Sequence, residues 1–155
     1  MKKYELTEET VTVYGKTLYR IRAVRDFGFV KTGEFGGYIE KEENLSHFGN
    51  AWISGNAWVS GDAKVSGNAW VFGDAKVFNT RHFFVQGPIG SRDGYVTFYR
   101  TKDDTVEVRC GCFSGSLQEF VNQVEETHGG SRYEKEYKLA AELAKVCIRL
   151  EGESR

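Results

Sequence analysis

Residues 49–78 repeat a six-residue unit five times, as GNAWIS, GNAWVS, GDAKVS, GNAWVF and GDAKVF. A fixed short period predicts a solenoid, because each unit buries its apolar face only by stacking on the next unit. Side chains alternate between the two faces of a short strand. We therefore expect the Ala and the Val or Ile of each unit to point inward and the residue between them to point outward. The Gly-Asn and Gly-Asp pairs supply the corners.

The outward positions carry three tryptophans, Trp52, Trp58 and Trp70. Large exposed apolar areas mark contacts with partners, so this column predicts an interaction surface. The alternative is that a terminal part of the chain folds back over the indoles.

The repeat resembles that of the hexapeptide-repeat family, whose fold is a left-handed parallel β-helix with about eighteen residues in each coil. The resemblance implies the left hand, since strand crossovers are in general right-handed. It also implies that Trp52 stacks on Trp70 and Trp58 on Lys76. The five units make less than two coils, so other parts of the chain must cap both ends.

The flanking segments provide these caps. Apolar alternation on both sides of residues 14–17 predicts a β-hairpin before the repeat. After Arg81 the period ends, and residues 82–86, 95–100 and 105–110 have the composition of strands. The predicted fold class is α+β, a short left-handed parallel β-helix capped by an N-terminal β-hairpin and a C-terminal β-meander with two helices. The predicted domains are residues 1–48 for the hairpin and an irregular first coil, 49–80 for the repeat, and 81–155.

The two helices have recognisable starts. Ser116 and Glu119 form an S-x-x-E capping box, and Ser131 and Glu134 repeat it after Gly129-Gly130. The second helix is apolar over more than half of its circumference, which predicts two packing partners. One of them is either another part of the same chain or another subunit.

Composition narrows the function classes. The chain has 155 residues, 40% of them hydrophobic, and a net charge of −1. No apolar run is long enough for a membrane, and the N-terminus lacks a secretion signal, so we expect a cytoplasmic protein. The balanced charge argues against a nucleic-acid polymer as partner. Cys110 and Cys112 supply only half of a zinc site, and neither a metal nor a cofactor is expected.

Two segments of residues 81–155 are candidate anion sites. In residues 87–92 two glycines let backbone amides approach a ligand, and side chains of this turn add donors. Residues 109–116 lead into a helix N-terminus, which favours anions. The alternatives are a plain strand connection, a serine that only caps the helix, and aromatic rings that belong to the core. The candidate ligand residues are Gly90, Ser91, Arg92, Arg109, Phe113, Ser114 and Ser116, with Arg100 and Arg132 as further donors.

A wider resemblance covers nearly the whole chain, on LYRIRAV, FGGYIEKEENLS, GPIGSRDGYVTFYRTKD and CGCFSGSLQEF. These segments are similar to hexapeptide-repeat proteins encoded by phages and prophages of Gram-positive bacteria. The resemblance implies a small protein that counteracts host defence inside the host cell. We predict a non-catalytic homo-oligomer that sequesters a small anionic, nucleotide-like ligand, with no catalytic residues.

Two rival functions remain open. One is an inhibitor that binds a host defence protein through the Trp face. The other is a hexapeptide-repeat acyltransferase, for which His47 or His82 would be the base. Fold similarity alone does not carry that activity.

Overall fold

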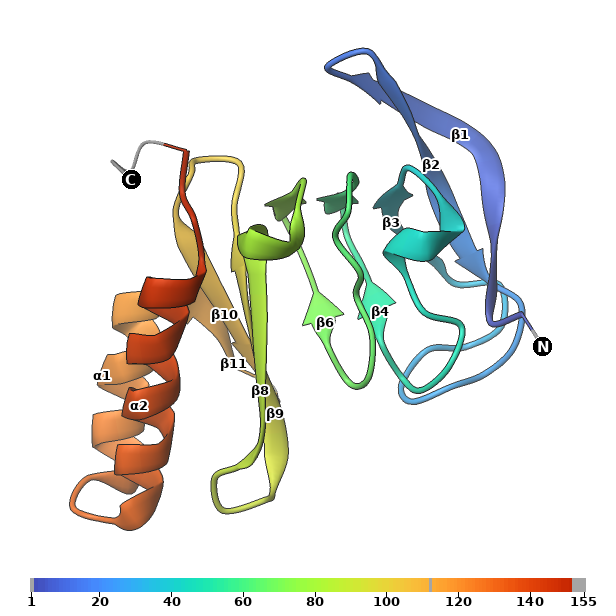
Figure 1. Cartoon of the computed structure of the whole chain (residues 1–155). Helices are drawn as coiled ribbons and strands as arrows, with labels where there is room; N and C mark the ends of the chain where they lie inside the picture. Colours follow the sequence, from blue (N-terminus) through green and yellow to red (C-terminus); the bar gives the residue numbers. More distant parts are fainter. Residues whose placement is uncertain (1, 112, 152–155) are drawn as a thin grey trace. The chain divides into compact units, whose positions relative to one another are not determined.

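The computed structural model describes residues 2–111 and 113–151, and the chain divides into two compact units, residues 1–80 and 81–155 (Figure 1). Unit 1 contains the N-terminal strands and the six-residue repeat. Unit 2 contains an antiparallel sheet with two helices.

Unit 1 begins with the predicted hairpin. Strands β1 (Tyr4–Val13) and β2 (Lys16–Ala23) pair antiparallel. They meet at Tyr14 and Gly15, whose φ angles of 49° and 78° are both positive. A two-residue turn with this geometry matches the twist of a hairpin. The hairpin prediction is therefore confirmed, and β3 (Phe35–Ile39) continues the pairing on the other side of β2.

The repeat forms four two-residue strands in the order of the chain. They are β4 (Trp52–Ile53), β5 (Trp58–Val59), β6 (Trp70–Val71) and β7 (Lys76–Val77). Parallel pairing joins Trp52 to Trp70 and Trp58 to Lys76, as the eighteen-residue spacing predicted. The inward direction of the small residues is also confirmed: Ala51, Ala57, Ala63, Ala69, Ala75, Ile53, Val59, Val65, Val71 and Val77 are all 0% exposed.

The predicted fold class is wrong in its central element, because the strands do not form a closed parallel β-helix. β5 and β7 belong to a five-stranded mixed sheet of order β1-β2-β3-β5-β7, and β4 pairs with β6 in a separate two-stranded sheet. The physical reason lies in β3, which pairs antiparallel with β2 and parallel with β5. The hairpin thus extends the sheet of the repeat and is not a separate cap on it.

Unit 2 has a four-stranded antiparallel sheet of order β11-β10-β9-β8. Its strands are β8 (Phe83–Ile89), β9 (Gly94–Arg100), β10 (Val106–Cys110) and β11 (Phe113–Ser116). The first three confirm the predicted strands. β11 was missed, because we expected those residues to lead directly into the helix.

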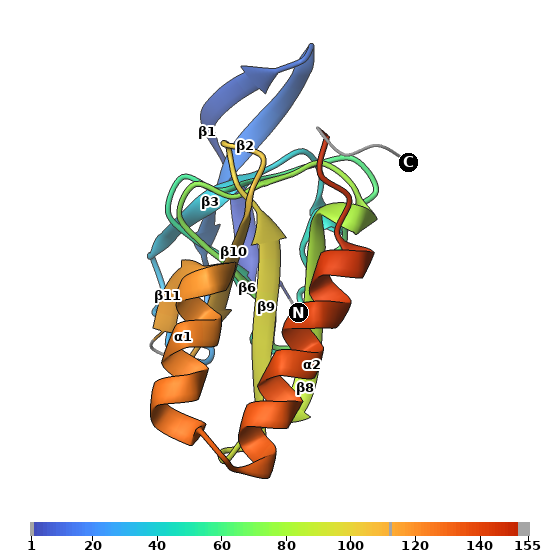
Figure 2. The same cartoon turned by 90° about the vertical axis from the view of Figure 1, so that its left-hand side faces the viewer.

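Helices α1 (Leu117–His128) and α2 (Arg132–Cys147) lie side by side on one face of this sheet (Figure 2). The core between them joins Val96, Phe98 and Val108 of the sheet to Phe120 of α1 and Ala141 of α2. Apolar residues alternate along the strands and recur at helical spacing, so both elements present one apolar face to the same core.

The two helix starts differ. In α1 the capping box forms as predicted, since Ser116 Oγ accepts from the Glu119 N–H and Glu119 Oε1 accepts from the Ser116 N–H. In α2 the Ser131 hydroxyl instead donates to the His128 carbonyl at 2.7 Å. Glu134 accepts from the N–H of Gly130, one residue outside a capping box. The sequence signature therefore predicted the start of α2 but not its hydrogen bonds.

Substitution of the corner glycines tests the stacking of the repeat. Gly61 and Gly67 occupy the same repeat position with φ of 67° and 64°. A Cβ on Gly61 would overlap the Phe78 carbonyl oxygen, whereas a Cβ on Gly67 meets nothing within 4 Å. Gly67→Ala should lower the free energy of unfolding by only the ~1–2 kcal/mol that an alanine costs in the left-handed conformation. Gly61→Ala should lose clearly more in urea unfolding of the whole chain, and equal losses would contradict the stacking.

Candidate functional site

The turn between β8 and β9 does not offer a free anion site. Gly90 has φ of 81°, and its N–H donates to Glu136 Oε1 of α2 at 2.7 Å. This carboxylate occupies the backbone amide that we expected a ligand to use. The Tyr137 hydroxyl also lies against Gly90, where it would overlap any added Cβ. Residues 87–92, which we expected to bind an anion, therefore pack against α2 through Gly90.

The two arginines predicted to share a phosphate come from different elements, Arg92 from the β8–β9 turn and Arg109 from strand β10. Arg92 is exposed in the turn, where its charge acts on Tyr137 of the helical layer. Arg109 pairs with Thr97 and Ser114, between residues of β10 that face the helices. Because side chains alternate along a strand, Arg109 points to the opposite face. The structure thus brings Arg109 and Ser114 together on paired strands, whereas Arg92 lies in a turn.

The other candidates in unit 2 are engaged within the chain or isolated. Arg100 is 6% exposed and pairs with Asp104 at 2.9 Å and Glu151 at 3.5 Å. Ser116 is the N-cap of α1, and the ring of Phe113 packs on Phe120 in the core at 5.7 Å. Ser91 and Arg132 are exposed, in the β8–β9 turn and at the first residue of α2. The predicted ligand residues therefore do not form one pocket.

The three tryptophans do not form an exposed column either. Trp52 is 1% exposed, so the prediction that it lies on the surface is wrong. Its indole packs against Phe27 at 5.2 Å and Tyr4 at 6.5 Å, so the N-terminal part of the chain does fold back over it. Trp58 and Trp70 are half-buried. Lys76 Nζ lies 3.9 Å from the centre of the Trp58 ring, and Trp70 Nε1 donates to Ser54 Oγ.

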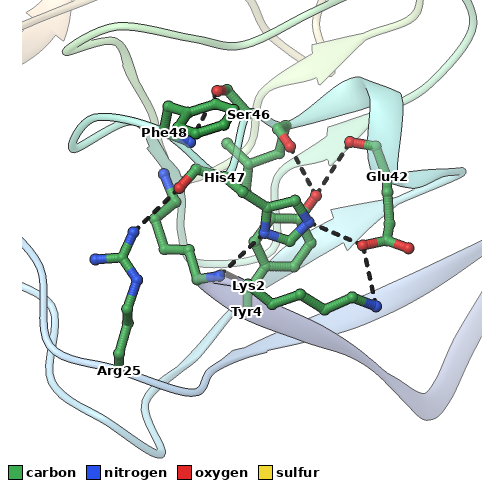
Figure 3. A network of polar contacts seen from close by, with 9 residues as sticks. Lys2, Tyr4, Arg25, Glu42, Ser46, His47 and Phe48 are labelled. Carbon is green, nitrogen blue, oxygen red and sulfur yellow. Dashed lines mark hydrogen bonds and ion pairs between the residues drawn. The ribbon is translucent and has the colours of Figure 1, made fainter.

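A polar network in unit 1 is centred on His47 (Figure 3). Its Nδ1 accepts the backbone N–H of Lys3 at 3.0 Å, and its Nε2 lies 2.8 Å from Glu42 Oε1. A backbone N–H can only donate, so Nδ1 is unprotonated and Nε2 carries the proton that Glu42 accepts. Both ring nitrogens are thus engaged. His47 is a structural residue here and has no nitrogen available to act as a base.

Tyr4 supports the same network. Its ring stacks on His47 with centroids 4.1 Å apart, and its hydroxyl donates to the carbonyls of Leu45 at 2.7 Å and Glu42 at 3.1 Å. Burial, followed by the nearby Glu42 and Glu43, raises the pKa of Tyr4. The hydrogen bond from His47 lowers the pKa of Glu42. The charge of Lys2, whose Nζ lies 3.5 Å from Glu42 Oε1, lowers this pKa further. Tyr4 therefore stays protonated and Glu42 stays ionised.

Next to this network lies a pair of cations, which we call the Lys3–Arg25 pair. The Lys3 ammonium is fully buried and donates to the Ala51 carbonyl at 2.6 Å. Arg25 Nη2 donates to the His47 carbonyl at 3.1 Å. Both cations lie over the ring of Phe27, at 4.7 Å and 5.9 Å from its centre. Aromatic faces attract cations, so Phe27 holds the two charges near one another.

The Lys3–Arg25 pair lacks negative charge. No carboxylate among residues 2–111 and 113–151 forms an ion pair with Lys3 or Arg25, and Arg25 Nε is buried without an acceptor. Burial and the charge of Arg25 lower the pKa of Lys3 from 10.5 to about 8. Two cations that are partly removed from water and have only carbonyl partners form an electropositive site.

We did not predict the Lys3–Arg25 pair from the sequence, although one signal for it was present. In the hairpin Tyr4 pairs with Ala23, and the N–H of Val24 donates to the carbonyl of Lys3. The register alone would have placed Lys3 beside residues 24 and 25. Residues 47–51 also bind the two cations, but they do so through backbone carbonyls. Every residue has a carbonyl, so these contacts leave no signal in the local sequence.

In the described ranges, no three or more His, Cys, Asp or Glu side chains are grouped so as to hold a metal ion. Cys112, one half of the Cys110–Cys112 pair, lies outside the described residues. No helix in the described part of the chain has both the length and the apolar character needed to span a membrane.

Comparison with protein-family models and with curated proteins found no match to the chain.

The low pKa of Lys3 predicts an unusual pH dependence of stability. Between pH 8 and 10.5 the unfolded chain holds the Lys3 proton and the folded chain does not. The contribution of Lys3 to the free energy of unfolding should therefore rise with pH in this window, by at most about 1.4 kcal/mol per unit. Urea unfolding at several pH values measures this. Lys3→Met should remove the rise, and the exposed neighbour Lys2→Met should keep it; a rise that survives Lys3→Met would contradict the assignment.

Proposed function

We propose that this protein is a non-catalytic binding protein that sequesters a small anionic, nucleotide-like ligand at the Lys3–Arg25 pair. The observation that carries the proposal is the pair of neighbouring cations without a carboxylate. The class of ligand is the one predicted from the sequence, but the site lies in unit 1 instead of unit 2. In unit 2, the backbone N–H of Gly90 and the guanidinium of Arg100 already bind carboxylates of the chain.

Electrostatics favours an anion at this pair. Lys3 and Arg25 repel one another, and this repulsion is one cause of the lowered pKa of Lys3. An oxyanion beside the guanidinium would offset the repulsion and restore the proton on Lys3. Arg25 is only half-buried, and its terminal nitrogen Nη1 donates to no described residue. Charge-assisted hydrogen bonds from guanidinium to carboxylate or phosphate are among the strong ones.

Two exposed phenylalanines come from segments adjoining the pair in sequence and support a ligand with a planar group. Phe48 is 80% exposed and follows His47, whose carbonyl binds Arg25. Phe29 is 87% exposed and follows Gly28, which lies against Asn50, two residues after Phe48. Aromatic faces stack on nucleobases, and exposed rings are accessible for such stacking. A phosphate at Arg25 with a base on one of these rings would use both features.

The rival functions have less support. The acyltransferase reading needs an accessible histidine with a free nitrogen. Both nitrogens of His47 are engaged, and His82 is buried. The inhibitor reading through the Trp face loses Trp52, which is buried. The role against host defence and the homo-oligomeric state stay predictions that come from the sequence.

Calorimetric titration with adenosine monophosphate tests the proposal, with inorganic phosphate and adenosine as separate probes. We expect the nucleotide to bind more tightly than either part alone. Arg25→Ala should weaken its binding at least tenfold, because the guanidinium supplies the charge-assisted contact. The control is Arg22→Ala, which removes an arginine of β2 that pairs with Glu5 and should leave the affinity unchanged. Affinity should also fall as pH rises above about 8, since Lys3 loses its proton there.

Two results would contradict this function. One is the absence of binding for both phosphate and the nucleotide. The other is binding that Arg92→Ala or Arg109→Ala abolishes while Arg25→Ala leaves it intact, which would return the site to unit 2.

A further inference from the structure

The imidazole of His47 joins two segments that are far apart in the sequence (Figure 3). Its Nδ1 accepts the backbone N–H of Lys3, 44 residues earlier, and its Nε2 donates to Glu42, five residues earlier. The bond to Glu42 is local to the 42–47 segment. The bond to Lys3 ties residues 2–4 to that segment, and we call it the His47 latch.

The His47 latch exists only while the imidazole is neutral. The N–H of Lys3 needs a lone pair, and a proton on Nδ1 replaces that lone pair by a second donor. Lys3 is 0% exposed, and its N–H has no other acceptor among the described residues. A buried donor that loses its acceptor is costly. Histidine side chains change their charge between pH 5 and 8, so mild acid opposes this bond.

The charges around the ring do not make up for the lost bond. They are three cations and two carboxylates, Lys2, Lys3, Arg25, Glu42 and Glu43. Arg25 donates to the carbonyl of His47 itself, so this cation is close to any charge on the ring. The stacked ring of Tyr4 adds no charge, because burial raises the pKa of its hydroxyl. A charged His47 therefore adds to an excess of positive charge.

Glu42 stabilises a charged His47 without holding residues 2–4 in place. The hydrogen bond from His47 lowers the pKa of Glu42, so this carboxylate stays ionised in mild acid. Because both residues belong to the 42–47 segment, their ion pair forms whether or not residues 2–4 are docked. The released state thus binds one proton more than the docked state. The ratio of docked to released chains should then fall by at most about tenfold for each pH unit.

Residues 2–4 cover groups that are otherwise open to water. The ring of Tyr4 packs against Trp52, with 6.5 Å between the ring centres, and Trp52 is 1% exposed. The ammonium of Lys3 donates to the carbonyl of Ala51 at 2.6 Å. Release of residues 2–4 would remove both contacts, so it would expose an indole and an ammonium group together.

We propose that the His47 latch is an acid switch: a proton on Nδ1 releases residues 2–4 from the 42–51 segment and uncovers Trp52. The switch depends only on contacts within unit 1. It does not rest on the ligand proposed at the Lys3–Arg25 pair. It also acts at lower pH than the titration of the Lys3 ammonium, whose pKa is about 8.

NMR of the isotope-labelled full chain between pH 7 and pH 5, in a buffer without phosphate, tests the switch. The nitrogen shifts of the His47 ring report its tautomer and its protonation. We expect a proton on Nε2 alone at pH 7 and on both nitrogens at pH 5. Over this range the protection of the Lys3 amide against hydrogen exchange should fall about tenfold or more. The indole N–H of Trp52, which is also buried, should lose protection in parallel.

Two substitutions of His47 separate the switch from general effects of acid. His47→Asn keeps an acceptor oxygen close to the position of Nδ1 but binds no proton, so the protection of the Lys3 amide should be the same at pH 7 and pH 5. His47→Gln keeps a donor toward Glu42 but places no acceptor near Lys3, so this amide should be poorly protected already at pH 7. His128→Asn changes a histidine of unit 2 and is the control that keeps the response of the unaltered chain.

Three results would overturn the proposal. One is protection of the Lys3 amide that persists down to pH 5. Another is a proton on Nδ1 instead of Nε2 at pH 7, which would remove the bond that forms the latch. The third is an equal loss of protection in His47→Asn, which would assign the acid response to another group. The first two are measured on the unaltered chain, so they decide the question even where a variant does not fold.

Discussion

Parallel backbone pairing between residues eighteen positions apart is the constraint on which unit 1 depends. The small alanines and the β-branched residues of the repeat are completely buried only because successive layers lie within hydrogen-bonding distance. The corners must then pass close to one another, which leaves no room for a side chain at Gly49 or Gly61. The repeat is also too short to be stable by itself, so its first layer needs a pairing strand from outside the repeat. β3 supplies that strand and connects the repeat to the hairpin.

Closing the first layer has a chemical consequence. The N-terminal residues run over residues 45–51, where the Tyr4 hydroxyl donates to the Leu45 carbonyl and the Lys3 ammonium donates to the Ala51 carbonyl. These contacts cover Trp52 and bury an ammonium group beside a guanidinium. The same packing that satisfies the backbone therefore creates the electropositive site on which the proposed function depends.

Unit 2 is held together in a different way. Its helices cover one face of an antiparallel sheet, and most of its polar groups near turns are used to hold elements together. Glu136 on Gly90 and Asp104 on Arg100 are examples of carboxylates that occupy donors which sequence patterns alone would assign to a ligand. This unit leaves exposed an apolar line on α2, formed by Leu139, Leu143 and Val146.

Local chemistry was readable from the sequence by itself. The stacking period, the inward alanines and valines, the hairpin turn at Tyr14-Gly15 and the capping box at Ser116 each depend on residues close together in the chain. Only the tertiary structure decided which sheet the short strands join, that Trp52 is covered, and that the carbonyls of His47 and Ala51 bind Arg25 and Lys3. These outcomes depend on pairing between segments tens of residues apart, and on backbone carbonyls that every residue carries alike. A pattern of side-chain types contains no record of either.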